Sequence, residues 1–121
     1  MGNFVTGTCV KTEKRHYYIN GDKCYIVPTK RVFDSWRFPY VVKATEKDMA
    51  KYLRMGKVGF RPGSFVKNFS TGEMYLIAGA ERRRIESPEV LIKYGFKRRK
   101  PQLVSQSEIN LHKEGDPIEW Q

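Results

Sequence analysis

An internal repeat constrains the fold of this chain more than any other feature of its sequence. Residues 7–11 (GTCVK) are matched 56 positions later by residues 63–67 (GSFVK), and further matches follow in the same order. Self-similarity with a constant period indicates tandem copies of one structural unit. We therefore predict one repeat unit at 7–60, a second at 63–118, and short arms at 1–6 and 119–121.

Each copy begins with a pattern typical of three short antiparallel strands. Alternating apolar and polar residues predict strands at 8–11, 16–19 and 23–27 in the first copy, and at 64–67, 74–77 and 82–85 in the second. Asn20-Gly21 lies between two of these strands, and both residue types tolerate the positive φ of a tight hairpin turn. Each copy is thus predicted to start with a β-meander.

The period then changes from that of a strand to that of a helix. Thr29 and Ser87 are N-cap residues ahead of apolar positions at helical spacing. Short strands at 40–43 and 102–105 follow, and Thr45 and Ser107 then cap further helical stretches. We expect the first of these stretches to cover 46–53 and the second to be scarcely one turn. Segment 57–63 joins the copies.

The predicted fold class is α+β, with two tandem repeats of a β-meander and short helices. A unit this small buries too little apolar surface to be stable alone. We therefore expect the copies to pack as one body with pseudo-two-fold symmetry around a shared core. The core residues predicted to meet there are Tyr17, Ile19, Ile26, Phe33 and Trp36 with Leu76, Ile85, Leu91 and Tyr94.

The chain lacks the residue patterns of an active site. Cys9 and Cys24 lie on strands two apart, too distant for a disulfide, so two free thiols are predicted, with Cys24 in the less dry position. His16 and His112 are the only histidines, and each is interpreted as a solvated residue. No phosphate-binding loop or catalytic motif occurs. We expect no enzymatic activity, no cofactor and no metal site.

The formal net charge of the 121 residues is +10, which favours an anionic partner. On a strand, alternate side chains share a face, so Arg82 and Arg84 can act together while Arg83 cannot. A predicted loop and the matching region of the first copy supply further basic residues. The candidate polyanion-binding residues are Arg82, Arg84, Lys97, Arg98, Arg99, Lys100, Lys30, Arg31 and Arg37. The alternative interpretation is a solvated surface that keeps the protein soluble.

The second copy carries a family resemblance in three segments, which are 74–79 (MYLIAG), 83–90 (RRIESPEV) and 94–96 (YGF). They resemble a tandem repeat of about 55 residues found in bacterial surface proteins and tailed-phage proteins. The first copy departs from that pattern, with Thr29-Lys30 in place of Ser-Pro and Trp36-Arg37 in place of Tyr-Gly. The resemblance implies an adhesion or assembly module and transfers no catalytic residues.

These observations favour a bacteriophage virion protein of the capsid surface, neck or tail. It would be made in the host bacterial cytoplasm and bind an acidic lattice of other virion proteins through its basic face and arms, as part of a multi-subunit assembly. The N-terminal residues show no Sec-type signal, and no apolar run is long enough for a membrane span. Two alternatives remain open: a nucleic-acid-associated protein without sequence preference, and a cell-wall polysaccharide module that stacks sugars on Tyr17, Tyr18, Tyr25 and Trp36.

Overall fold

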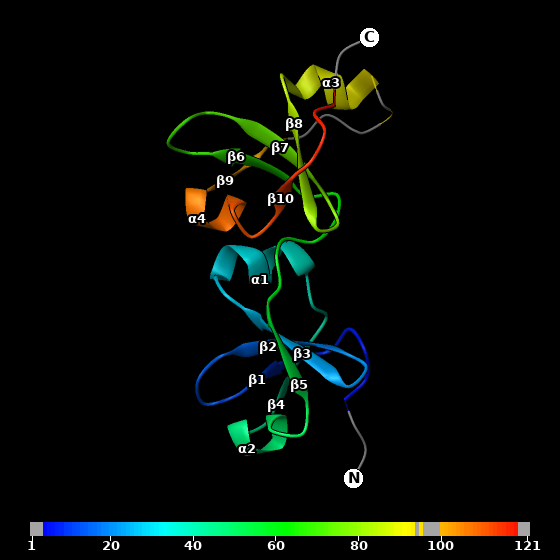
Figure 1. Ribbon diagram of the computed structural model, residues 1–121, viewed down its shortest axis with the longest axis vertical. Helices are drawn as coiled ribbons and strands as arrows, with labels where there is room; N and C mark the ends of the chain where they lie inside the picture. The colour runs from blue at the N-terminus through cyan, green and yellow to red at the C-terminus, as the bar shows by residue number, and fades with distance from the viewer. Residues whose placement is uncertain (1–3, 94, 96–99, 119–121) are drawn as a thin grey trace. The chain divides into compact units, whose positions relative to one another are not determined.

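The computed structural model describes residues 4–93, 95 and 100–118 and divides the chain into two compact units (Figure 1). Unit 1 is Met1–Gly59 and unit 2 is Phe60–Gln121. The described residues form two five-stranded mixed sheets and four short helices, which confirms the α+β class. None of these helices is long and apolar enough to cross a membrane.

Unit 1 contains five strands and two helices. The strand order in its sheet is β4-β1-β2-β3-β5. Strand β2 is antiparallel to its neighbours β1 and β3, whereas β4 is parallel to β1 and β5 is parallel to β3. The elements are β1 (Cys9–Lys11), β2 (His16–Asn20), β3 (Lys23–Val27), α1 (Lys30–Trp36), β4 (Val41–Lys43), α2 (Glu46–Met49) and β5 (Leu53–Lys57).

Unit 2 has the same order of strands in the same relative directions, β9-β6-β7-β8-β10. Backbone contacts also match: Gly7 N–H donates to Ile19 O at 2.8 Å, and Gly63 N–H donates to Ile77 O at 2.7 Å. Both glycines have φ near +90°, a conformation that other residues rarely adopt. The elements are β6 (Phe65–Asn68), β7 (Met74–Ala78), β8 (Glu81–Ile85), α3 (Pro88–Lys93), β9 (Gln102–Val104), α4 (Gln106–Ile109) and β10 (Lys113–Glu114).

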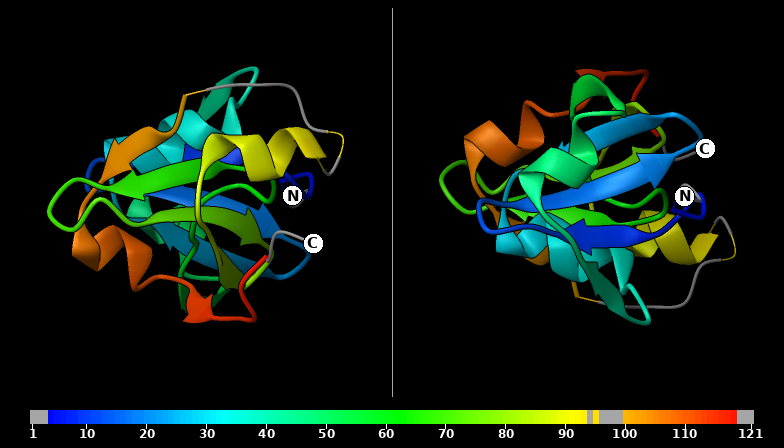
Figure 2. Two further views of the ribbon diagram at one scale, coloured as in Figure 1. Left: turned by 90° about the horizontal axis from the view of Figure 1, so that it is seen from above. Right: turned by 90° about the horizontal axis from the view of Figure 1, so that it is seen from below.

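The two units are therefore similar halves, each built as a meander followed by two crossover connections (Figure 2). In each unit the first helix leads from one side of the meander to the far edge, and the second helix leads back to the opposite edge. Crossovers between parallel strands are almost always right-handed, so connections that run in opposite directions place their helices on opposite faces of the sheet. The duplication and the pseudo-two-fold packing of the halves stay predictions.

The core of unit 1 lies between its sheet and α2. Val10, Tyr17, Ile19 and Cys24 contribute from the strands, and Met49 contributes from the helix. His16 and Tyr18 alternate with these strand residues and so lie on the other face, which α1 covers. Each unit thus encloses buried residues of its own, and in unit 1 helices cover both faces of the sheet.

Unit 2 has the same arrangement of sheet and helices, but its main buried cluster lies on the other face of the sheet. Its buried cluster lies on the α3 side and contains Phe65, Leu76 and Ile85 from the strands with Val90 and Leu91 from the helix. The opposite face, covered by α4, holds Val66, Tyr75 and Ile77. In Figure 1, α3 and α4 lie on opposite sides of the second sheet, as α1 and α2 do for the first.

Two sequence predictions about the second helix of each unit are wrong. Helix α2 ends at Met49 instead of continuing to residue 53, because the chain turns into the parallel edge strand β5. The N-cap of α4 is Ser105 and not Ser107: the Ser105 hydroxyl accepts from Glu108 N–H at 3.2 Å, and the Glu108 side chain accepts from Ser105 N–H. Thr45 and Asp48 form the same capping box in α2, so both helices are four residues long.

Candidate binding surface on unit 1

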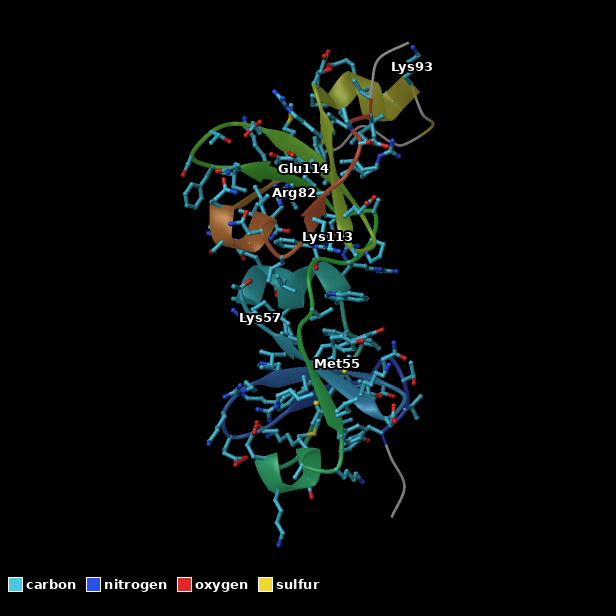
Figure 3. The ribbon with its side chains drawn as sticks, viewed as in Figure 1. Met55, Lys57, Arg82, Lys93, Lys113 and Glu114 are labelled. Carbon is cyan, nitrogen blue, oxygen red and sulfur yellow. The ribbon has the colours of Figure 1, made fainter. Side chains whose placement is uncertain are left out.

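The arginines predicted to form a surface cluster in unit 2 are used within the unit itself. Arg82 donates from Nη1 to the carbonyl oxygens of Ile109 (3.1 Å), the last residue of α4, and His112 (2.7 Å), which follows the helix. Its guanidinium group also lies 5.5 Å from the centre of the Tyr75 ring. Figure 3 shows Arg82 on the strand next to Glu114 of β10. Arg82 therefore fixes the end of α4 against the sheet, and its assignment to a polyanion surface is wrong.

The neighbouring arginines of β8 are also engaged. Arg83 donates from Nε to the Asp116 carbonyl oxygen at 2.9 Å, which holds the segment after β10. Arg84 lies at 3.5 Å from the Glu73 carboxylate, with 63% of its side chain exposed. Because that carboxylate neutralises it, Arg84 adds little net charge to the surface of unit 2.

The predicted basic loop lies mostly outside the described residues. This applies to Lys97, Arg98 and Arg99, whereas Lys100 is described and exposed. The described part of unit 2 therefore offers few basic side chains that are both exposed and without an internal partner.

The basic residues predicted for the first copy do lie on its surface. Lys30 and Arg31 begin α1, and Arg37 ends it in a left-handed conformation with φ of 51°. All three are exposed. Lys30 is 2.9 Å from Asp34, one turn further along the helix, so it shares its charge with that carboxylate in solvent. The three residues of unit 1 that the sequence had indicated are thus exposed, at the two ends of α1.

A pocket of about 510 Å³ lies beside this group and was missed in the sequence. The β1–β2 turn supplies Lys14 and Arg15, and His16 follows at the start of β2. The beginning of α1 supplies Lys30 and Asp34 from the other side, and the apolar lining consists of Val27, Pro28 and Phe33. The sequence alone did not indicate Lys14 and Arg15, because the proximity of their turn to α1 depends on the crossover that lays α1 over this face.

The electrostatics of the pocket are those of an anion site. In the described part of the chain, neither Lys14 nor Arg15 forms an ion pair. Burial lowers the pKa of His16, and the Lys11 cation lowers it further, so the neutral imidazole is favoured near pH 7. The His16 ring packs on Phe33 with centroids 4.9 Å apart. The pocket therefore combines exposed positive charge at its rim with a flat, largely uncharged wall.

Aromatic side chains continue from this wall along the α1 face. Tyr18 lies 5.0 Å from Trp36 between ring centroids, and Trp36 stacks on Phe38 at 6.2 Å with an interplanar angle of 9°. Trp36 Nε1–H donates to the Gly59 carbonyl oxygen at 2.8 Å. These rings are half-buried and packed on each other, and Tyr17 is fully buried on the opposite face, so they do not present separate stacking platforms.

A second polar cluster, on the α2 side, is internally satisfied. The Glu46 carboxylate accepts from the hydroxyls of Thr12 (2.5 Å) and Tyr17 (2.8 Å). Arg54 of β5 donates to the Tyr17 hydroxyl at 2.7 Å. These bonds, the one from Thr12 above all, hold the pKa of Glu46 below its ordinary value. The cluster fastens α2 and β5 to the sheet and leaves no group oriented toward a substrate.

The cysteines and His112 were predicted in part. Both cysteines are free thiols, as expected. They lie on opposite faces of the sheet, because Cys9 is opposite Tyr18 and Cys24 is opposite Ile19 in the strand register. Tyr18 and Ile19 are neighbours in β2, so their side chains point to opposite faces. Cys24 is buried, as Cys9 is, and the charged groups of Arg54 and Glu46 lie near it. His112 is also buried, at 4% exposure, and not solvated. In the described ranges, no three His, Cys, Asp or Glu residues are grouped as a metal site would require.

Comparisons with known proteins add no relationship to this geometry. No family model, curated protein or solved structure matches the chain.

Proposed function

We propose that this chain is a non-enzymatic assembly protein, a component of a bacteriophage particle, that binds an acidic protein surface through the basic α1 side of unit 1. The observation that carries the proposal is the different use of charge in the two units. In unit 1, Lys14, Arg15 and Arg37 are spread around one pocket and one helix. In unit 2, the β8 arginines bind carbonyl oxygens and a carboxylate of their own unit.

The strand edges favour docking through side chains over docking through added strands. The edge strands β4, β9 and β10 are only two or three residues long. The fourth edge strand, β5, carries a bulge, because Tyr25 of β3 faces both Met55 and Gly56. Short and bulged edges, with Lys57 exposed at the end of β5 (Figure 3), resist pairing with another strand. Of the contacts expected for an assembly protein, a charged side-chain surface is therefore the one we propose.

The proposal is tested by looking for the chain in particles and then for its partner. Mass spectrometry of purified particles should detect the chain, and cross-linking should join it to an acidic structural subunit through lysines of unit 1. Binding to that subunit should weaken as salt is raised, because the contact is between exposed charges. Absence from the particles, with no cross-linked acidic subunit, would contradict the virion role.

Nucleic acid is the second candidate, because the same exposed cations would attract phosphates. A gel shift over a salt series separates the two ideas. Tight binding of the isolated chain to DNA, falling steeply with salt and independent of sequence, would favour the nucleic-acid role. If the partner is a protein, as we propose, binding to the acidic subunit should survive at salt concentrations that abolish the DNA complex.

A further inference from the structure

The pocket on unit 1 has the chemistry to hold a single anionic group at a defined place. Three cations reach it from two directions, with Lys14 and Arg15 on the β1–β2 turn and Lys30 on α1. Asp34 is the one carboxylate that lines it, and Lys30 already pairs with Asp34 at 2.9 Å. Lys14 is exposed and forms no ion pair in the described structure, whereas the half-buried Arg15 also acts on the Glu46 carboxylate.

The interior of the pocket limits what can carry that anion. Val27, Pro28 and Phe33 make part of the wall apolar, and the neutral form of His16 lies between them and the cations. A ligand that fits has a short apolar stem behind its negative charge. A glutamate or aspartate side chain on an extended segment has this form.

Unit 2 provides an internal contrast for this pocket. In the matching register, Met74 takes the place of His16 and Ile85 takes the place of Val27. At the start of the first helix, Pro88 stands where unit 1 has Lys30. The apolar wall is thus present in both units, whereas the basic groups are particular to unit 1. A fold requirement would act on both units, so a ligand explains the difference better.

We propose that this pocket binds an acidic side chain of an extended segment on the partner protein and anchors the docking surface of unit 1. The inference rests on the proposed function, which names the partner as an acidic protein. It adds the contact point and the chemical group that is bound there.

His16 supplies a local reporter of occupancy. The charged or titratable groups around it are Lys11 on its own sheet, Lys14 and Arg15 in the turn, and Lys30 and Asp34 on α1. A carboxylate bound among the cations opposes their effect, so the pKa of His16 should rise when the pocket is filled. Binding to any other basic part of the chain leaves that titration unchanged.

The test uses the full chain and an extended peptide of alternating glutamate and valine as the probe. Binding is followed by NMR, through the His16 ring and the amides of the β1–β2 turn. The pocket variant is Lys14→Glu/Lys30→Glu. Its matched control, Lys43→Glu/Lys47→Glu, changes net charge equally on exposed residues of β4 and α2. Lys14→Ser is added because it removes one rim charge without placing a new carboxylate near Asp34.

We expect the pocket variant to weaken peptide binding by roughly tenfold, and the control by about twofold at most. Lys14→Ser should weaken binding by a few-fold and keep the native spectrum, so that loss of binding is separated from loss of fold. The His16 titration should move to higher pH when the peptide binds to the unchanged chain.

Several results would overturn the inference. Equal losses in the pocket and control variants would mean that net charge alone drives binding. No binding of the peptide, or binding without any change in the His16 titration, would remove the pocket as its site. Tighter pocket-dependent binding of a short oligothymidylate would assign the pocket to phosphate. If the acidic subunit still binds the pocket variant normally, the inference fails and the proposed function stands.

Discussion

His112 makes unit 2 sensitive to acid in a way that can be worked out from its contacts. Its Nε2 accepts from Phe60 N–H at 2.9 Å, and its Nδ1 lies 3.1 Å from the Gly79 carbonyl oxygen. A carbonyl can only accept, so Nδ1 carries the proton and Nε2 does not. Protonation of Nε2 would set two donors against each other in a buried site. The folded unit therefore requires the neutral ring.

The sign of the pH effect follows from the same geometry. Burial lowers the pKa of His112, the hydrogen bond to Gly79 opposes this change, and the Arg82 cation adds to it. The unfolded chain, with an ordinary histidine pKa, takes up the proton first as the pH falls. Stability is thus retained above the ordinary pKa and lost below it, by up to about 1.4 kcal/mol per pH unit. The loss should set in as the pH falls below about 6.5, and it can be followed down to about pH 5.

Unit 1 contains the control for this effect. Phe4 N–H donates to the Tyr52 hydroxyl at 2.7 Å, and the two rings stack at 6.1 Å, as Phe60 and His112 also do. Tyrosine hydroxyls do not titrate in this pH range. The same contact is therefore present in both units, and only the unit 2 version can be broken by a proton.

The assay is native-state hydrogen exchange of the Phe60 and Phe4 amides over this pH range, corrected for intrinsic exchange. Protection of Phe60 should fall faster than protection of Phe4. His112→Gln keeps one donor and one acceptor without titrating, so it should flatten the pH dependence of Phe60. His16→Gln tests the other histidine with a lowered pKa, and it should leave Phe60 unchanged. A His112→Gln chain that loses Phe60 protection as steeply as the natural sequence would refute the reasoning.

Three further outcomes are expected. Ser105→Ala should lower the free energy of unfolding by about 1 kcal/mol in urea titrations, whereas Ser107→Ala should change it little, since only Ser105 caps α4. Arg82→Ala should cost about 2 kcal/mol because it removes two charged hydrogen bonds, and Arg84→Ala at the exposed Glu73 pair should cost less than half of that; equal losses would contradict the inward role of Arg82. Burial raises the pKa of Cys9 to about 11, so a thiol reagent at neutral pH should react with the native chain slowly and with both cysteines after denaturation; rapid reaction of the folded chain would argue against this burial.

The meander and the first helix of each unit could be predicted because their signals are local. Alternation, the Asn20-Gly21 turn and the cap at Thr29 depend on neighbouring residues. The edge strands β5 and β10 were missed because parallel pairing is long-range. Leu53 pairs with Lys23 and Lys113 with Glu81, at separations at which the sequence gives no periodic signal. Helix α2 was extended to 53 for the same reason.

The candidate site shows the same limit. The cations on α1 could be indicated from the sequence. Lys14 and Arg15 could not, because they belong to the pocket only through the crossover that places α1 beside their turn. Arg82 was misassigned because alternation gives the face of a strand and not what covers that face. Helix α4 covers it, and its end presents carbonyl oxygens that a guanidinium group can satisfy.

The comparison between units explains why we place the partner on unit 1. At the position where unit 1 has the buried Cys24, unit 2 has Arg82, since each lies opposite the matching isoleucine, Ile19 or Ile77. In unit 1 the cation on the matching face is Arg54 of the edge strand β5, which lies 5.4 Å from the centre of the Tyr17 ring. Both units therefore use one arginine over one tyrosine to hold the second helix. This arginine meets the structural need for charge in each unit, and we therefore propose an acidic ligand for the further cations around the unit 1 pocket.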